Sequence, residues 1–435
     1  MKYIKSTLLT VLISTYLLSA FASHLENDTC KLLTHSLTVS ASQYLQFPIV
    51  GQNEHSMADA LPSYVTQKIP TSLIKEVVDN GLTIEILGIP PPILQSCSSN
   101  ISHFEEIVFN YKKKEDKEEN FRRPSYYYKT DKKEKTLVVS VMAGEDYLKQ
   151  YTALISYYLK FNLGKNPDDI LRVTSFPALE KNIGLWTHLD ENFVKPNDTV
   201  LIGNVSDFFD HLKTEGFLPQ IIEESENFYY KATRVKLGNR LLSFLRVKYS
   251  FWGNMSANLV KKTLDLGAFE LIYMSKIATL NNPADIYKKI YSPTQFAVME
   301  DNQVKIIDPI INPLVEKFPE LDSGMHLSLA TVMEQDFETS AVAHSVASSL
   351  DLEVSKIARV VAEYNLLHNR QIPFTPVHWA TDYLRTKEEA NLDTGFDLSN
   401  GDSKPSKEKK VLILKRIYHF VTAYLLSTDL VVKKK

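Results

Sequence analysis

The chain has 435 residues and a formal net charge of −3, with 44% hydrophobic and 23% charged residues. These values describe an ordinary globular protein, and a mildly acidic chain argues against nucleic acid as the main partner. The length suits one large domain or two of ordinary size.

The first 22 residues have the pattern of a secretory signal peptide. Lys2 and Lys5 form a positive start, an apolar run follows, and positions 20–22 read Ala-Phe-Ala, which suits cleavage. The run is short for a membrane span, although an uncleaved anchor is the alternative. We therefore predict a secreted or periplasmic protein that begins near Ser23, carries a formal charge of about −5 and has no stable membrane span after cleavage.

Two cysteines occur, Cys30 and Cys97, and both follow the predicted signal. An oxidising compartment favours a disulfide between them, which the chain-entropy model values at about 4 kcal/mol. Two free thiols are the alternative. No Cys/His group has the spacing of a zinc site, and no P-loop or G-x-S-x-G motif occurs, so neither a metal nor another cofactor is predicted.

Residues 23–190 form an N-terminal region of unknown role, with a charged connector near 112–135. We expect the connector to be a solvated loop and its tyrosines, "SYYYK", to lie in a loop or an edge strand. A polyanion-binding patch is the alternative, but acidic residues interrupt the basic ones.

From residue 136 onward, short apolar runs alternate with helical patterns. Strands are predicted at 136–144, 199–204, 240–251, 269–275, 349–354 and 374–382. Helices are predicted at 206–216, at 255–267 and directly after Glu353.

Strands alternating with helices predict an α/β fold with a mostly parallel sheet covered on both faces. Ligands of such sheets bind beyond the carboxyl ends of the strands. A polar linker at 401–410 precedes a C-terminal amphipathic helix, so that residues 401–435 form a final unit that docks on the body.

Two stretches resemble the nucleoside phosphorylase and nucleosidase family. Residues 251–280 are similar to that family's strand, Gly-rich turn, helix, strand and ligand loop, with small residues at Gly253, Ser256, Ala257 and Gly267. The second stretch begins with Asp351-Leu352-Glu353 and is similar to the family's acid-Met-Glu motif at a strand end. The resemblance implies a three-layer α/β/α sandwich over residues 191–400 and a small-molecule nucleoside as the ligand.

The resemblance also implies roles for these residues. Glu353 would hold the ribose hydroxyls, Leu352 would pack on the sugar or base, and Asp351 would also contact the substrate. Downstream, Thr381-Asp382 stands where the family has Ser-Asp, and Asp382 would protonate or hydrogen-bond the purine N7 as the base leaves. A dry pocket would raise the pKa of that aspartate above about 3.9. A right-handed crossover would lay the two strands side by side, so that both acids converge on one pocket.

A second alignment with the family is open. Residues 335–347 also contain an acid-x-Glu pattern, which would place Glu338 at the sugar and Glu363 at the base. Apolar residues recur at helical spacing from Val354 to Tyr364, however, so that segment is predicted to be a helix rather than a strand. This favours Glu353 with Asp382.

The chain departs from the family in its ligand loop. That loop reads "SKIATL", with Ser275 and Thr279 but no glycine, and a glycine-free backbone approaches an anion less closely. Ser275, Thr279 and Gly203 are predicted to contact the substrate, and Lys276 is a candidate phosphate ligand. Asp207 would serve as a base for water or as an ordinary acid at a helix N-terminus.

Two further residues have alternatives. His326 would line the pocket rim or be an ordinary surface or core residue, and Trp379 is predicted to lie in the core rather than stack on a base.

The function predicted is cleavage of the N-glycosidic bond of a purine nucleoside by an exported protein. The reaction would be phosphorolysis, with phosphate as co-substrate, or hydrolysis. A non-catalytic nucleoside-binding module and a secreted interaction protein that uses residues 23–190 are the alternatives. A homo-oligomer is left open.

Overall fold

The computed structural model describes residues 28–97, 104–107, 124–131, 134–217, 219–249, 251–394 and 403–427. The predicted signal peptide and the first part of the charged connector lie outside these ranges. Among the described residues, no helix combines the length and the apolar character that a membrane span requires.

The N-terminal region contains a six-stranded sheet of mixed direction, in the order β1-β6-β2-β5-β4-β3. Its strands are β1 (Leu37–Ser40), β2 (Thr83–Leu87), β3 (Phe104–Ile107), β4 (Ser125–Asp131), β5 (Glu134–Ser140) and β6 (Leu171–Ser175). The helices are α2 (Ala41–Leu45), α3 (Ala60–Lys68), α4 (Thr71–Asp79), α5 (Pro91–Cys97), α6 (Glu145–Tyr157), α7 (Pro167–Ile170), α8 (Pro177–Lys181) and α9 (Ile183–Trp186).

The tyrosines of the connector are not in a loop or at a sheet edge. They form β4, which lies between β5 and β3, and Tyr126 and Tyr127 are buried. Aromatic residues suit a pleated, half-buried surface, and this preference outweighs the charged flanks. The predicted disulfide is confirmed, since Cys30 is bonded to Cys97 at the end of α5.

The second sheet has eleven strands, and its continuous path runs β14-β13-β15-β16-β11-β7-β10-β9-β8. The strands are β7 (Thr199–Gly203), β8 (Gln220–Glu226), β9 (Tyr230–Leu237), β10 (Arg240–Val247), β11 (Glu270–Thr279), β12 (Ile290–Tyr291), β13 (Gln295–Glu300), β14 (Gln303–Ile307), β15 (Met325–Ser328), β16 (Ser349–Asp351) and β17 (Phe374–Tyr383). The helices that follow or precede them are α10 (Ser206–Thr214), α11 (Asn254–Asp265), α12 (Pro313–Lys317), α13 (Phe337–Val346), α14 (Val354–His368) and α15 (Lys404–Leu426).

The prediction of a mostly parallel sheet is wrong. Among the described residues, five of the ten strand pairings are antiparallel. Tight turns produce two of them: Gly238 has a φ of 59° between β9 and β10, and Asp301 and Asn302 have φ values of 52° and 58° between β13 and β14. Such left-handed turn residues match the twist of a hairpin. The fold is therefore mixed α/β.

Each predicted strand from residue 136 onward coincides with a strand of the structure, and the three predicted helices are α10, α11 and α14. The segment 358–364 lies within α14, as its periodicity predicts.

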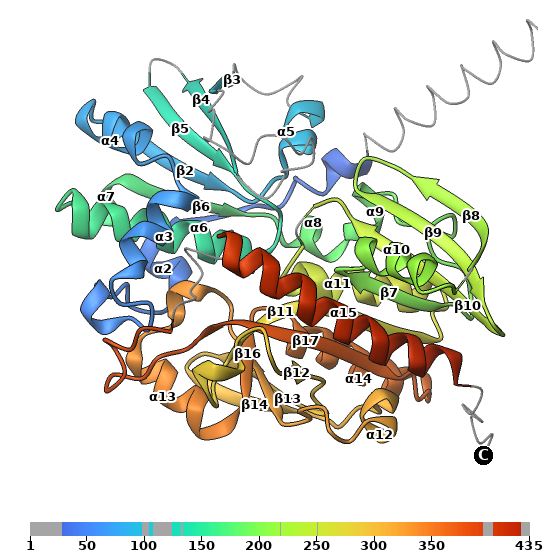
Figure 1. Ribbon diagram of the computed structural model, residues 1–435. Helices are drawn as coiled ribbons and strands as arrows, with labels where there is room; N and C mark the ends of the chain where they lie inside the picture. The colour runs from blue at the N-terminus through green and yellow to red at the C-terminus, as the bar shows by residue number, and fades with distance from the viewer. Residues whose placement is uncertain are drawn as a thin grey trace, which may run out of the picture.

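The two sheets share buried apolar packing. One core cluster includes Val138 of β5, Leu271 of β11 and Val361 of α14, so the N-terminal region and the second sheet pack against each other. Figure 1 shows α15, in red, crossing the second sheet, where Ile417 and Val421 belong to a second core cluster. The N-terminal region thus covers part of the second sheet and of α14.

Candidate functional site

Asp351 ends β16 and acts as a cap for α14. Its carboxylate accepts hydrogen bonds from His326 Nε2 at 2.8 Å and from Ser328 Oγ at 2.7 Å. It also accepts the backbone N–H groups of Glu353 and Val354, at 3.0 and 3.1 Å. Burial opposes the charge, but His326, together with the hydrogen bond from Ser328, keeps the pKa of Asp351 below its ordinary value. The carboxylate is fully engaged in holding the helix start.

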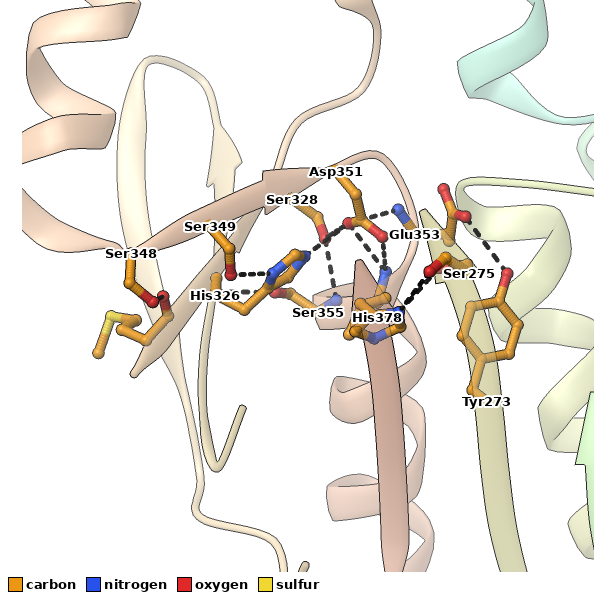
Figure 2. A network of polar contacts seen from close by, with 12 residues as sticks. Tyr273, Ser275, His326, Ser328, Ser348, Ser349, Asp351, Glu353, Ser355 and His378 are labelled. Carbon is orange, nitrogen blue, oxygen red and sulfur yellow. Dashed lines mark hydrogen bonds and ion pairs between the residues drawn. The ribbon is translucent and has the colours of Figure 1, made fainter. Parts of the chain in front are cut away.

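Glu353, two residues later, has a different environment (Figure 2). Its Oε1 accepts a hydrogen bond of 3.3 Å from the hydroxyl of Tyr273 on β11. Burial and the neighbouring charge of Asp351 raise the pKa of Glu353 well above its usual range, although Tyr273, Lys276 and Lys356 oppose the shift. Glu353 is therefore a partly buried acid whose charge the protein compensates poorly.

His326 does not lie at a pocket rim. It is fully buried in β15, where Nδ1 is 2.8 Å from Ser349 Oγ and Nε2 donates to Asp351. Its ring stacks on that of His378 at 6.1 Å between centroids.

Ser275 is likewise buried, and its Oγ lies 3.0 Å from Nδ1 of His378 on β17. Burial, with a smaller contribution from His326, lowers the pKa of His378 to about 3, so this imidazole is neutral at physiological pH. Within the described part of the chain, Nε2 of His378 has no hydrogen-bond partner.

The two strands that carry the predicted acids are not side by side. β16 pairs with β15 and, antiparallel, with the end of β11, whereas β17 runs parallel to β11 along its length. The expected side-by-side arrangement is wrong because β16 is a three-residue strand that pairs with residues 278–279 of β11 in the opposite direction. Both strands nevertheless meet β11 near Ala278, which is opposite Leu350 on one strand and Asp382 on the other.

Asp382 is the penultimate residue of β17, and its Oδ1 accepts a hydrogen bond of 2.8 Å from the hydroxyl of Thr381. Its charge, after burial, contributes to the raised pKa of Tyr64 on α3. A helix of the N-terminal region therefore lies close to this end of β17.

The other predicted contacts have structural roles. Thr279 is buried and accepts a hydrogen bond of 2.7 Å from Tyr291. Gly203 has a φ of 97°, and a Cβ at this position would lie 2.1 Å from the carbonyl oxygen of Met274, so only glycine allows β7 to approach β11 here. Leu352 is partly buried between core clusters, and Trp379 is buried in the core as predicted.

A cavity of about 510 Å³ lies between the N-terminal region and the second sheet. The N-terminal region contributes the segment Leu45–Pro48 and the start of α6, whereas the opposite wall includes Asn254, Ala330 and Lys356. Of the acids weighed from the sequence, Glu338 lines this cavity, while Glu353 and Asp382 do not. Lys356 lies one turn after Glu353 on α14. Its charge acts on Glu353, and its side chain also lines the cavity.

The cavity lining is strongly acidic. The N-terminal region contributes Glu145 and Asp146. The opposite wall contributes Glu300, Asp301, Glu334, Asp336 and Glu338. The lysines among the lining residues are Lys149, which is paired with Glu145 at 2.9 Å, and Lys356, which is paired with Asp146 at 2.6 Å.

Sequence reasoning did not identify Lys356 or Asp146. A basic residue in the first turn of a helix is unfavourable next to the helix dipole, so Lys356 at this position indicates that an acidic partner lies nearby.

Asp207 is exposed in the first turn of α10, and Glu363 is exposed on α14. Among the described residues, no group of three or more His, Cys, Asp or Glu side chains has the arrangement of a metal site.

No protein-family model matches the sequence. The chain is 28% identical over 405 residues to Oxidoreductase cns1 of Cordyceps militaris, a match that covers 89% of this chain and 51% of that protein. The chain thus spans about half the length of the curated relative that it matches.

Several solved structures show a partial likeness. A futalosine hydrolase mutant of Helicobacter pylori is 15% identical, with a TM-score of 0.36, over 51% of this chain and 99% of that one. The Campylobacter jejuni 5'-methylthioadenosine/S-adenosyl homocysteine nucleosidase is 14% identical, with a TM-score of 0.38, over 53% and 98%. The Toxoplasma gondii purine nucleoside phosphorylase is 14% identical, with a TM-score of 0.36, over 54% and 95%. Likenesses of this size do not define the function of this chain.

Proposed function

We propose that this protein cleaves the N-glycosidic bond of a purine nucleoside, with Glu353 as the sugar-binding residue. The environment of Glu353 carries the proposal, because burial and Asp351 raise its pKa while Tyr273 is its hydrogen-bond donor. Hydrogen-bond donors favour the ionised form of such a carboxyl group, and a ligand with two adjacent hydroxyl groups, such as ribose, supplies them to the partly buried Glu353. A carboxylate held against the sugar also stabilises the positive charge that develops as the bond breaks.

Asp382 is the proposed acid for the leaving base. It stands near the end of β17, and Thr381 orients its carboxyl group. Protonation or strong hydrogen bonding of the purine N7 makes the base a better leaving group, and a positioned acid contributes about 10²- to 10⁴-fold to such a step. In this proposal, residues 191–400 are a nucleoside phosphorylase-like α/β/α unit, and the site lies near the end of β17.

Hydrolysis is favoured over phosphorolysis by the charges near Glu353. The carboxylate of Asp351 lies beside Glu353, and Lys356, one turn along α14, is already paired with Asp146 at 2.6 Å. The glycine-free segment after Met274 offers no close backbone approach to an anion. Water is therefore the proposed nucleophile, and phosphate is not required.

The test is release of free base from purine nucleosides by the purified chain, with and without inorganic phosphate. Equal release in both conditions supports hydrolysis, whereas strict dependence on phosphate replaces it with phosphorolysis. Tight nucleoside binding without release supports the second candidate, a non-catalytic binding module, which is favoured by the glycine-free segment after Met274. If the chain neither binds purine nucleosides nor releases free base from them, the proposal is wrong.

Export to a secreted or periplasmic location belongs to the same proposal, and the Cys30–Cys97 disulfide is compatible with it.

A further inference from the structure

The C-terminal helix α15 has a charge opposite in sign to that of the whole chain. It contains six cationic residues and one acidic residue, Glu408, and therefore has a net charge of +5, whereas the chain has −3. The cationic residues are Lys404, Lys407, Lys409, Lys410, Lys415 and Arg416. A positive surface on an acidic protein attracts anionic partners, and added salt weakens that attraction.

One face of α15 packs on the second sheet, and the opposite face is exposed. Figure 1 shows the helix on the outside of the molecule. The buried face includes Ile413, Ile417 and Val421 of the second core cluster. The exposed face is therefore free to contact a partner while the helix stays docked on the body.

The exposed face combines cations with aliphatic side chains. Lys407, Val411 and Lys415 follow one another at i,i+4 spacing, and Leu412 lies beside Val411. Val411 is 55% exposed and Leu412 is 64% exposed. Two aliphatic side chains thus stand in water between two lysines.

The lysines of this face have few acidic partners. The ammonium group of Lys404 lies 3.9 Å from Glu408, but both side chains are largely exposed, so this pair is weak. Within the part of the chain that the structure describes, no carboxylate forms an ion pair with Lys407 or Lys415. Their charges are therefore available to an external anion.

The surface beside Arg416 is more evenly charged. The guanidinium group donates to the carbonyl oxygen of Lys288, and both residues line one cavity together with Asp285 and Glu320. These acids offset the cations at that place. The strongest positive charge of the helix is therefore in its first half, around Val411.

We propose that the exposed face of α15, defined by Lys407, Val411, Leu412 and Lys415, binds an anionic lipid surface. The lysines contact the head groups, and the two aliphatic side chains enter the boundary between head groups and acyl chains. A soluble polyanion would match the cations but would leave Val411 and Leu412 in water. Among the described residues, no helix could span a membrane, so the contact is peripheral. The inference is independent of the proposed nucleoside chemistry.

The experiment measures sedimentation of the purified chain with lipid vesicles. Vesicles of phosphatidylcholine alone are compared with vesicles that contain about one quarter phosphatidylserine. Wild type should bind the anionic vesicles about tenfold more tightly, and added salt should weaken this binding. Val411→Gln with Leu412→Gln keeps the charge and should lower the affinity for anionic vesicles about tenfold, because the aliphatic contact is lost.

The charge variant is Lys407→Gln with Lys415→Gln. Its affinity for anionic vesicles should fall about tenfold or more, since each cation near such a surface contributes about fivefold. The matched control, Lys75→Gln with Lys261→Gln, removes the same charge from exposed lysines of α4 and α11 and should bind like wild type. Thermal unfolding checks that all variants fold.

Three outcomes would overturn the inference. The first is a wild-type chain that binds neither kind of vesicle, and the second is a charge variant that binds anionic vesicles like wild type. The third is unchanged binding when Val411 and Leu412 are replaced, which would indicate a soluble anionic partner that needs only the cations.

Discussion

The hydroxyl of Tyr273 donates to the carboxylate of Glu353 across 3.3 Å, and so ties the middle of β11 to the start of α14. Two residues earlier, Asp351 has four donors and a lowered pKa, whereas Glu353 has a raised one. One acid of the Asp-x-Glu pair therefore holds the start of α14, whereas the other accepts a hydrogen bond from Tyr273 on β11.

Replacing Glu353 should weaken nucleoside binding. In Glu353→Ala the dissociation constant for a purine nucleoside should rise about tenfold to hundredfold, because the sugar hydroxyls lose their acceptor and an unsatisfied hydrogen-bonding group costs roughly 1–3 kcal/mol. Titration calorimetry measures the change. Glu363→Ala, on an exposed position of the same helix, is the control and should bind like wild type. Wild-type affinity in Glu353→Ala would exclude Glu353 as the sugar-binding residue and favour Glu338, which lines the cavity.

Asp382→Asn should keep nucleoside binding and lose base release. The amide preserves the shape and can still accept from Thr381, but it cannot deliver a proton, so the rate of release should fall by ~10² or more. Chromatographic measurement of free base at saturating nucleoside isolates this step. Asp207→Asn, at the exposed start of α10, is the control. An unchanged rate in Asp382→Asn would exclude the aspartate as the acid.

Much of the second sheet could be predicted from local patterns, but the site could not. Apolar runs identified the strands that carry Ser275 and Asp382, and helical spacing identified α14. The hairpin turns at Gly238 and at Asp301-Asn302 were also readable as local signals, and overlooking them gave the wrong strand directions.

The pairing of Asp146 with Lys356 spans 210 residues of sequence. No local pattern specifies which distant helix start will meet which lysine, because that contact depends on how the N-terminal region packs on the second sheet. The same holds for the cavity, whose walls come from both regions.

Glu180 should make stability depend on pH. Burial raises the pKa of this acid from 4.5 to about 8, with Asp146 and Glu145 adding to the shift while Lys356 and a backbone N–H of Glu145 oppose it. Between pH 4.5 and about 8 the folded state keeps a proton that the unfolded state releases. The free energy of unfolding should therefore fall as pH rises through this window, by up to about 1.4 kcal/mol per pH unit, and this contribution should level off above it.

Glu180→Gln should remove that slope, since an amide does not titrate, and should be more stable than wild type at the upper end of the window. Urea unfolding at several pH values gives the measurement. Glu363→Gln, an exposed acid, is the control and should follow the wild-type curve. Parallel curves for wild type and Glu180→Gln would show that the carboxyl group is ionised in the folded protein.

The ion pair of Asp146 and Lys356 should contribute strongly to the union of the two regions. Both side chains are 4% exposed and lie 2.6 Å apart, so removing one partner leaves the other charge buried. Lys356→Met should lower the free energy of unfolding by about 3–5 kcal/mol.

Asp146→Asn keeps an oxygen for the N–H of Asn254 and removes the charge. The variant with both changes should therefore lose less free energy of unfolding than the sum of the losses in the two single variants. Lys75→Met, in the exposed pair with Asp79, should not change stability measurably. Additive losses in the double variant would mean that the two side chains act independently, and α6 would then be held against the second sheet by apolar packing rather than by this pair.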